Sequence, residues 1–414
     1  MNSKFYFLSL LLVVLFSTQT SFATEPTVEE LRSMGPAGLQ ALMTQYAGEI
    51  DRHIANPSLA SDEEWQRITT ALDTVAQQKN SYLAGLYWYT DIESAKKASA
   101  RSGKPILSLR LLGKLTDEFS CANSRFFRTV LYPNAEVSSV LRDRFVLHWQ
   151  SVRPVPTVTI DFGDGRKLER TLTGNSIHYI LDSQGRPIDA LPGLYGPQAF
   201  LCGLTDAETL FKSLVDHKQQ RNLLLTVYYR QQHTKISAAW TSDTDKIVGK
   251  KPERSTGVKT TNVQAVNIAR LAMTKSVTEF SILRAMLATT EKLGSITDEA
   301  AWKKIAQLHA SDAMLDERSV LLIKRQNPEL TDQEFSGLLQ KFQELIALDT
   351  VRNEYLLHSK LYTWLVEPIR NDVEQLNEQV YAELFLTPRS DPWLGLFSTD
   401  VYTALDNGGV VKPR

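Results

Sequence analysis

A single aliphatic run decides the fold of this chain: Ile106-Leu107-Ser108-Leu109-Arg110-Leu111-Leu112. Large apolar side chains at consecutive positions are typical of a central strand that is covered on both faces. Just before this run, Thr90-Asp91 predicts the start of a helix over 92–102, since an aspartate at that position can accept a hydrogen bond from the first turn. Gly103 predicts the end of the helix. With the aromatic strand expected at 87–89, the order strand, helix, strand predicts an α/β fold.

The pattern continues downstream with strands, one hairpin and two helices. A long helix is predicted over about 122–145, with a kink at Pro133 because proline removes a backbone donor. Gly163-Asp164-Gly165 predicts the turn of an inserted hairpin rather than a phosphate-binding loop, since it lies between two strand patterns. The remaining predicted elements are strands at 145–149, 177–181 and 187–191 and a closing helix from Pro197 past Leu214.

The regions on either side are predicted to be mainly helical. A helical lead-in is expected over 24–84, and the alternative is a mobile N-terminal extension. After an α/β domain at 85–218, a helix and a polar linker are expected over 219–262, with the linker itself at 241–262. A helical domain is expected over 263–385, with helices at 263–293, 298–310, 316–324, 331–348 and 351–384. The tail at 386–414 is irregular yet apolar, so we expect it to dock in a groove.

The first residues have the pattern of a signal peptide, expected over 1–23. Lys4 supplies the positive charge, 5–16 the apolar segment and Ser21-Phe22-Ala23 the cleavage site. The apolar segment is shorter than the ~20 residues that a membrane-spanning helix needs. We therefore expect a soluble periplasmic or secreted protein with no stable membrane insertion after cleavage.

Composition excludes several classes of function. A formal net charge of -1 gives no overall attraction to nucleic acid. Two cysteines, Cys121 and Cys202, cannot form the framework of a chain of this length. No cofactor motif is present, and no set of residues has the spacing of a metal site. Glu354 and His358 share a helical face but lack a third ligand, so we interpret them as a solvent-exposed polar pair.

Two segments resemble thioredoxin-like proteins. The first runs from Trp88 through the helix to Gly103-Lys104-Pro105, the strand entrance. The second runs from Tyr179 through Asp182-Ser183-Gln184-Gly185 to Leu191-Pro192-Gly193. The resemblance covers roughly 88–217 and implies a thioredoxin-like domain followed by a mostly helical C-terminal domain. We recognise no family in the C-terminal helices.

The resemblance places a candidate site at Cys121, where a helix is predicted to begin after a buried strand. Redox-active members carry Cys-x-x-Cys, whereas this chain has Cys121-Ala122-Asn123-Ser124. They also carry a cis-proline opposite the cysteine, at a position that falls near Asn175-Ser176 here. The resemblance thus implies Cys121 and Ser124 as catalytic candidates and Asn175, Ser176 and Gly193 as the substrate-binding edge.

The chemistry of Cys121 follows from its position. Backbone N–H groups and the positive end of the helix dipole favour a thiolate, and Arg125 and Arg128 act in the same direction. Ser124 can hydrogen-bond a thiolate but cannot resolve a mixed disulfide. Cys202 is the one other thiol and is interpreted as a packing residue, with a Cys121–Cys202 disulfide as the alternative. Cys121 itself is either reactive or a small buried hydrophobe in a fold kept for binding.

Three functions follow from these alternatives. The leading hypothesis is a partner-binding scaffold of the cell envelope, which could also capture a protein partner in a transient mixed disulfide at Cys121. The enzyme alternative is a thiol-disulfide isomerase or reductase that depends on an external reductant. The third is a structural assembly factor recruited through the helices. His178, on a predicted strand, is interpreted as a satisfied sheet histidine.

Overall fold

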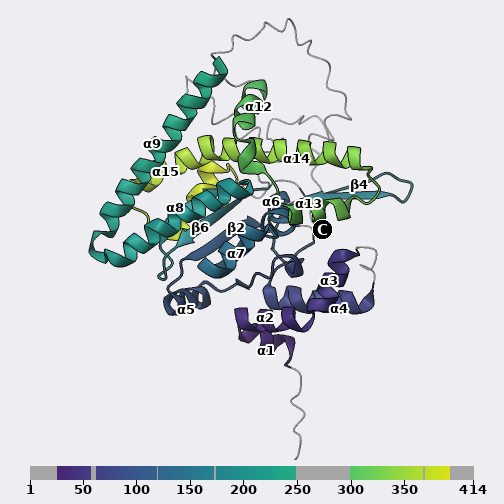
Figure 1. The fold of residues 1–414 in the computed structure, drawn as a ribbon. Helices are drawn as coiled ribbons and strands as arrows, with labels where there is room; N and C mark the ends of the chain where they lie inside the picture. Colours follow the sequence, from purple (N-terminus) through teal and green to yellow (C-terminus); the bar gives the residue numbers. More distant parts are fainter. Residues whose placement is uncertain are drawn as a thin grey trace, which may run out of the picture.

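The computed structural model describes residues 26–56, 62–118, 120–171, 174–248, 299–366 and 369–391. Its centre is a five-stranded sheet in the order β1-β3-β2-β6-β7 (Figure 1). Both β1 and β2 are parallel to β3, whereas β6 is antiparallel to β2 and to β7. Every residue of β2 is buried, so the prediction of a central strand is confirmed. The strands are β1 (Trp88–Tyr89), β2 (Ile106–Leu112), β3 (Val146–Arg153), β6 (Ser176–Leu181) and β7 (Pro187–Pro192).

Helices connect the parallel strands. Asp91 caps α5 (Ile92–Ser102) by accepting a hydrogen bond from the Ser94 N–H at 2.7 Å, and Gly103 ends it with a φ of +69°. The predicted single helix over 122–145 is wrong, because Pro133 ends one helix instead of bending it. The chain forms α6 (Ala122–Phe126) and a π-helical turn η3 (Phe127–Leu131), and Asn134 then caps a new helix, α7 (Ala135–Arg144).

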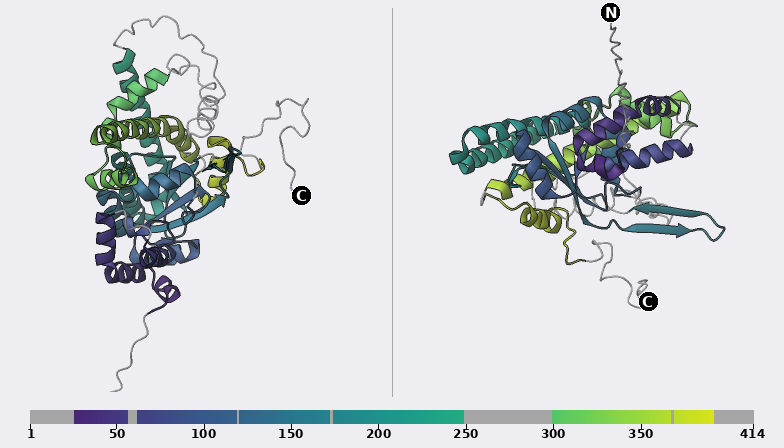
Figure 2. Two further views of the ribbon diagram at one scale, coloured as in Figure 1. Left: turned by 90° about the vertical axis from the view of Figure 1, so that its right-hand side faces the viewer. Right: turned by 90° about the horizontal axis from the view of Figure 1, so that it is seen from below.

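The remaining predicted elements of the α/β region are present. The hairpin of β4 (Thr157–Asp161) and β5 (Lys167–Thr171) pairs only with itself and projects from the body (Figures 1 and 2). The closing helix is α8 (Pro197–Asp216), which packs on β7. Across the sheet, Tyr179 of β6 meets α16 (Val373–Gln379) through a hydrogen bond to Asn377.

The N-terminal helices are packed on the start of the sheet rather than free. Arg32 donates hydrogen bonds to the carbonyls of Val75 at 2.8 Å and Trp88 at 2.7 Å. The helices share an apolar cluster of their own, which includes Trp65 and Leu72. They are α1 (Val28–Ser33), α2 (Pro36–Gln45), α3 (Ala47–Ala55) and α4 (Glu63–Ala76), followed by the 3-10 turn η2 (Ser81–Leu83).

The C-terminal helices share one continuous apolar core with the sheet. In Figure 1, α14 lies across the upper half of the molecule, below α12, and α9 lies along the left side. The helices are α9 (Arg221–Val248), α12 (Glu299–Leu308), α13 (Glu317–Gln326), α14 (Asp332–Arg352), α15 (Ser359–Val366) and α16. Short turns connect them: η4 (Lys218–Gln220) and η5 (Ala310–Ala313) are 3-10 turns, whereas η6 (Asn353–His358) and η7 (Val380–Leu384) are π-helical.

Two sequence predictions fail in this region. The predicted linker over 241–262 is helical as far as Val248, because Asp243 is buried and accepts hydrogen bonds from His309 and from the Tyr355 hydroxyl, each at 2.6 Å. The predicted helix over 351–384 is divided into η6, α15, α16 and η7. The rest of the linker, the predicted helix at 263–293 and most of the tail, including Trp393, lie outside the described residues.

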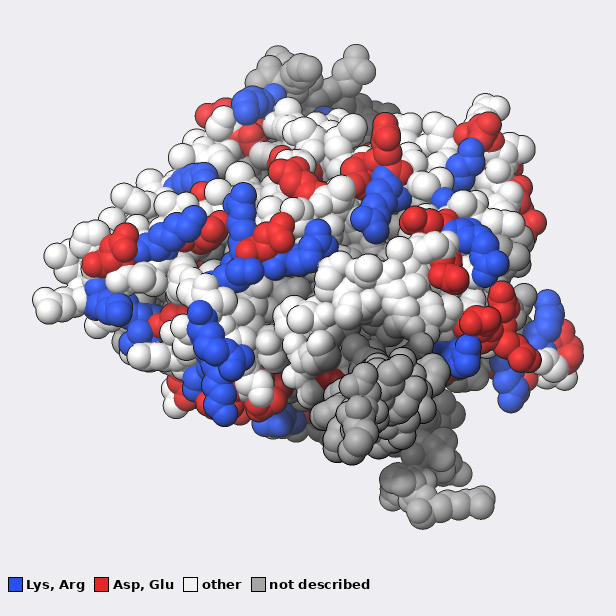
Figure 3. All heavy atoms as spheres, turned by 60° about the horizontal axis from the view of Figure 1, so that its bottom comes forward, with Lys and Arg blue, Asp and Glu red and all other residues white. Residues whose placement is uncertain are grey.

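Charged side chains of both signs are mixed on one face of the protein. Figure 3 shows acidic and basic side chains interspersed over the face that it presents. None of the helices in the described ranges combines the length and the apolar character that a membrane span requires. The predicted signal peptide at 1–23 lies outside those ranges.

Candidate functional site

Cys121 lies where the sequence predicted, at the start of a helix that follows a central strand. It is the N-cap of α6, and its Sγ accepts a hydrogen bond from the Ser124 backbone N–H at 3.4 Å. The side chain is 0% exposed. The thiol therefore has the helix-start environment that favours a thiolate, but solvent does not reach it.

The side chains around Cys121 are buried as well. Arg128 is fully buried and donates a hydrogen bond to the Glu118 carbonyl at 2.8 Å. Burial lowers the pKa of this guanidinium. Among the described residues, its Nε and one terminal nitrogen have no hydrogen-bond partner. A positive charge thus stands near the thiol, in agreement with the expectation for Arg128.

Ser124 does not contribute through its hydroxyl. The side chain is fully buried, and within the described part of the chain its Oγ has no hydrogen-bond partner. The contact with Cys121 is made by the Ser124 backbone N–H instead. The expectation that the Ser124 side chain bonds the sulfur is therefore wrong, because the N-cap geometry directs the amide to it.

The structure brings the Asn175-Ser176 edge next to the cysteine. The Asn123 side chain, two residues after Cys121, donates a hydrogen bond to the Ser176 Oγ at 2.8 Å. The Asn175 side chain donates in turn to Thr387 at 3.3 Å, and the Tyr381 hydroxyl donates to the Asn175 carbonyl at 3.2 Å. The predicted substrate edge is thus occupied by the chain's own C-terminal residues.

We call residues 373–391 the C-terminal cover. Buried Arg110 on β2 holds it through Glu374, whose carboxylate lies 2.5 Å from the guanidinium. Arg153 donates a hydrogen bond to the Asp391 carbonyl at 2.7 Å. Burial and then the nearby Cys121 raise the pKa of the Tyr381 hydroxyl. The cover therefore both fills the edge and lies close to the sulfur.

Gly193 lies apart from this arrangement, although its N–H donates to the Ser176 carbonyl at 2.8 Å. It has a φ of +86°, and a Cβ there would lie 2.5 Å from the side-chain nitrogen of Asn353 in η6. The residue is where two layers of the protein approach closely. Close packing against Asn353 and a positive φ thus explain why the residue at this position is glycine.

Cys202 does not pair with Cys121. Neither cysteine is in a disulfide, and Cys202 is exposed on α8. The interpretation of Cys202 as a packing residue is wrong, because its side chain faces out of the helix between the buried Leu201 and Leu204. It is the accessible thiol among the described residues.

The structure agrees with the interpretation of one histidine and contradicts that of another. His178 is the satisfied sheet histidine that was expected: its Nε2 lies 2.8 Å from the Tyr132 hydroxyl, and burial lowers its pKa to about 3. The interpretation of Glu354 and His358 as a solvent-exposed pair is wrong. His358 is 5% exposed, and its Nδ1 lies 2.8 Å from the Glu354 carboxylate.

Sequence reasoning missed the partner of this pair, Asp189 of β7. The Asp189 carboxylate is buried and accepts hydrogen bonds from the hydroxyls of Tyr228 at 2.5 Å and Tyr362 at 3.1 Å. His358 stacks on the Tyr362 ring at 4.3 Å between centroids. The available signal was an aspartate inside the apolar strand pattern at 187–191, since a buried carboxylate needs partners.

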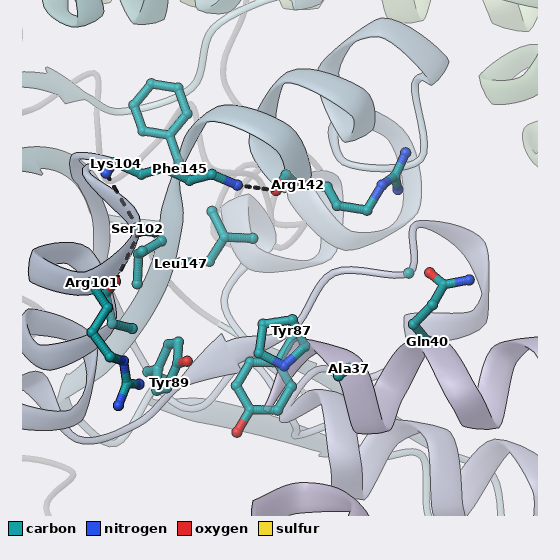
Figure 4. A pocket seen from close by; sticks show the side chains of 14 residues that line it. Ala37, Gln40, Tyr87, Tyr89, Arg101, Ser102, Lys104, Arg142, Phe145 and Leu147 are labelled. Atoms are coloured by element: carbon teal, nitrogen blue, oxygen red, sulfur yellow. Dashed lines mark hydrogen bonds between the residues drawn. The ribbon is translucent and has the colours of Figure 1, made fainter. Parts of the chain in front are cut away.

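This cluster lines a cavity of about 440 Å³ between β7, α8, α9 and η6. A further cavity of about 530 Å³ lies between α2, α5 and α7. Three basic side chains line the latter, but Arg101, Lys104 and Arg142 point in different directions (Figure 4). They do not converge on one point, so that cavity has no shared anion site. No group of residues suited to hold a metal ion is present in the described ranges.

Comparison of the chain with protein-family models, with curated proteins and with solved structures finds no match.

Proposed function

We propose that this chain is an exported thioredoxin-like protein that acts mainly as a partner-binding scaffold in the cell envelope. Three features support the thioredoxin-like assignment: a mixed sheet in the order β1-β3-β2-β6-β7, a cysteine at the start of the helix after β2, and a closing hairpin followed by α8. Export rests on the signal-peptide pattern at 1–23, which implies a periplasmic or secreted location.

The observation that carries the scaffold function is the burial of Cys121 beneath the C-terminal cover. A thiol must reach a partner disulfide to react with it, and the attacking atom here is 0% exposed. The edge on which a partner's chain would dock, Asn175-Ser176, is bonded to Tyr381 and Thr387. Partner binding therefore falls to other surfaces of the protein.

An insulin-reduction assay with dithiothreitol tests this function. We expect the full-length protein to accelerate reduction no more than Cys121→Ala does, and both forms to retain the same envelope proteins when immobilised. Acceleration by the wild type that is lost in Cys121→Ala would contradict the scaffold function. The matched control is Cys202→Ala, which removes the exposed thiol instead.

The second candidate is a thiol-disulfide isomerase or reductase with an external reductant. The N-cap position of Cys121 favours it, since the Ser124 N–H already donates to the sulfur. In that mechanism the Cys121 thiolate would attack a partner disulfide, form a mixed disulfide and release one partner thiolate. An external thiol would then attack the mixed disulfide and return Cys121. Trapping with an alkylating agent tests it: abundant partner adducts at Cys121 support this function, and none supports the scaffold.

A further inference from the structure

The cavity beside Asp189 is built from parts of the chain that are far apart in the sequence. It lies between β7, α8, α9 and η6, and its volume of about 440 Å³ is within the range of small-molecule sites. A π-helical turn, η6, supplies both Glu354 and His358 to its wall. Such turns occur frequently at functional sites. The location and size therefore suit a small ligand.

The charged side chains of the wall are already paired. Lys235 lies 3.1 Å from the Asp206 carboxylate, and His358 lies 2.8 Å from that of Glu354. Asp189 accepts hydrogen bonds from the Tyr228 and Tyr362 hydroxyls and from a backbone N–H. His309, also in the wall, is bonded to Asp312 and Asp243. Each of these charged side chains therefore already has a hydrogen-bond or ion-pair partner within the protein.

Two buried polar atoms in the wall, the His358 Nε2 and the Tyr195 hydroxyl, make no hydrogen bond of normal length among the described residues, although the carboxylates of Asp189 and Glu354 lie close enough to act on them. Their side chains are 5% and 3% exposed. The nearest charged oxygen to the His358 Nε2 belongs to Asp189 and is 3.9 Å away, which is too far for a hydrogen bond. Buried polar atoms normally have partners. These two atoms therefore mark where a ligand would bond.

The His358 ring acts as a donor at this point. Burial opposes its charged form, but the carboxylates of Glu354 and Asp189 outweigh burial and raise the pKa to about 9. At neutral pH both ring nitrogens carry hydrogen, and the Nε2–H can donate to an acceptor oxygen such as that of a hydroxyl group. A hydroxyl group of a ligand at this position can accept a hydrogen bond from the His358 Nε2–H and donate one to a neighbouring carboxylate.

We propose that this cavity binds a neutral, hydroxyl-bearing small molecule of the sugar or polyol class, with one hydroxyl oxygen at the His358 Nε2 and a second at the Tyr195 hydroxyl. The apolar side chains of Ile236 and Val351 and the Tyr228 ring complete the wall. They suit the carbon face of such a molecule. Binding here is separate from the scaffold function, since the Cys121 site contributes no residue to this cavity.

Cys202 provides the reporter for the test, because it is exposed and lines the cavity, whereas Cys121 is buried. The probes are three molecules that share the pyranose ring: glucose, which is neutral, glucuronate, which is anionic, and glucosamine, which is cationic. N-acetylglucosamine and glucitol extend the neutral set. The measurement is the rate at which a thiol reagent modifies Cys202 in the full-length protein, with calorimetry as a second readout.

We expect at least one neutral probe to slow modification of Cys202 several-fold and to bind with measurable heat, while glucuronate and glucosamine do neither. His358→Leu should weaken that protection at least tenfold. Tyr195→Phe, which removes only a hydroxyl, should weaken it several-fold and serves as the variant if His358→Leu does not fold. His217→Gln, outside the cavity, is the matched control and should leave protection unchanged.

Three results would overturn the proposal. The first is that no neutral probe protects Cys202 or releases heat. The second is that a charged analogue binds more tightly than its neutral parent. The third is that protection persists unchanged in both His358→Leu and Tyr195→Phe, since the ligand would then bind without the two atoms that define the site.

Discussion

Two buried polar regions of this protein differ in the pKa, and hence the charge state, of the histidine that each contains. Beside the cysteine helix, His178 has Tyr132 and aromatic rings for neighbours, no carboxylate of the described residues acts on it, and burial lowers its pKa to about 3. In the cavity, His358 has the carboxylates of Glu354 and Asp189 beside it, and its pKa is about 9. The difference shows that burial alone does not set the charge state: the partners do.

The two regions also differ in how accessible they are to solvent. Cys121 is 0% exposed and lies near Tyr381 of the C-terminal cover, whereas the cavity wall carries an exposed thiol and two polar atoms without a hydrogen bond of normal length. The region that a sequence motif identifies is therefore the closed one. The region without a motif is the one that solvent and small molecules can enter. Four changes test this contrast.

The largest expected effect is on Asp189. Asp189→Ala would leave two tyrosine hydroxyls unpaired and remove one carboxylate from His358. We expect a loss of about 3–5 kcal/mol in the free energy of unfolding, as for other broken buried pairs. Urea denaturation measures it. Asp206→Ala, which breaks a more exposed pair with Lys235, should cost less than about 1 kcal/mol. Equal losses in the two variants would contradict the account.

The two histidines predict opposite pH dependence. The folded pKa of His358 is above the ordinary value of 6.5, so its contribution is complete below pH 6.5 and is lost as pH rises through about 9. The loss should amount to about 3 kcal/mol. The folded pKa of His178 is about 3, so this contribution to stability is lost as pH falls from 6.5 towards 3. A third histidine, His148, is buried on β3 with its Nδ1 2.8 Å from the Ser108 hydroxyl, and its pKa of about 3 adds to the same acid decrease.

Urea denaturation across pH 3 to 10 separates these contributions. His358→Gln should abolish the alkaline decrease and leave the acid decrease in place. An alkaline decrease of the same size in His358→Gln would show that other groups cause it, and the assignment of a charged His358 would be wrong.

The attachment of the C-terminal cover is tested on α16. Glu374→Ala leaves the buried Arg110 guanidinium without its carboxylate, although Gln150 remains as a partner. We expect a loss of about 1–2 kcal/mol, because Glu374 itself is largely exposed. Modification of Cys121 by thiol reagents should also become faster.

Glu378→Ala is the matched control for this change, since Glu378 is on the same helix and pairs with Arg389 at 3.8 Å on the surface. It should change stability by less than about 0.5 kcal/mol and leave Cys121 protected. If both variants expose Cys121 equally, the Arg110 contact does not hold the cover.

The smallest effect is expected at Ser124. Its hydroxyl is buried without a partner among the described residues, and the backbone N–H makes the contact with Cys121. Ser124→Ala should change the free energy of unfolding by less than about 1 kcal/mol, or raise it slightly, because an unsatisfied polar group is removed. Ser138→Ala is a comparison, since its buried hydroxyl bonds the Ala135 carbonyl. A larger loss for Ser124→Ala would show that its hydroxyl has a role.

The sequence predicted the elements that local rules control. The aliphatic run of β2, the Asp91 cap, the hairpin turn and the position of Cys121 at a helix start all follow from neighbouring residues. The burial of Cys121 could not be predicted in this way, since Tyr381 and Thr387 reach the Asn175 edge from more than two hundred residues away. The same holds for the pair Glu354 and His358, whose third member is on β7.

The most direct test of the central claim, that Cys121 is inaccessible in the folded protein, is a count of reactive thiols. The native protein is treated with an isotopically labelled alkylating agent and then unfolded and treated with the unlabelled form, and mass spectrometry assigns each cysteine. The account predicts that Cys202 carries the first label and Cys121 the second. Labelling of Cys121 in the native protein at the rate of Cys202 would contradict it.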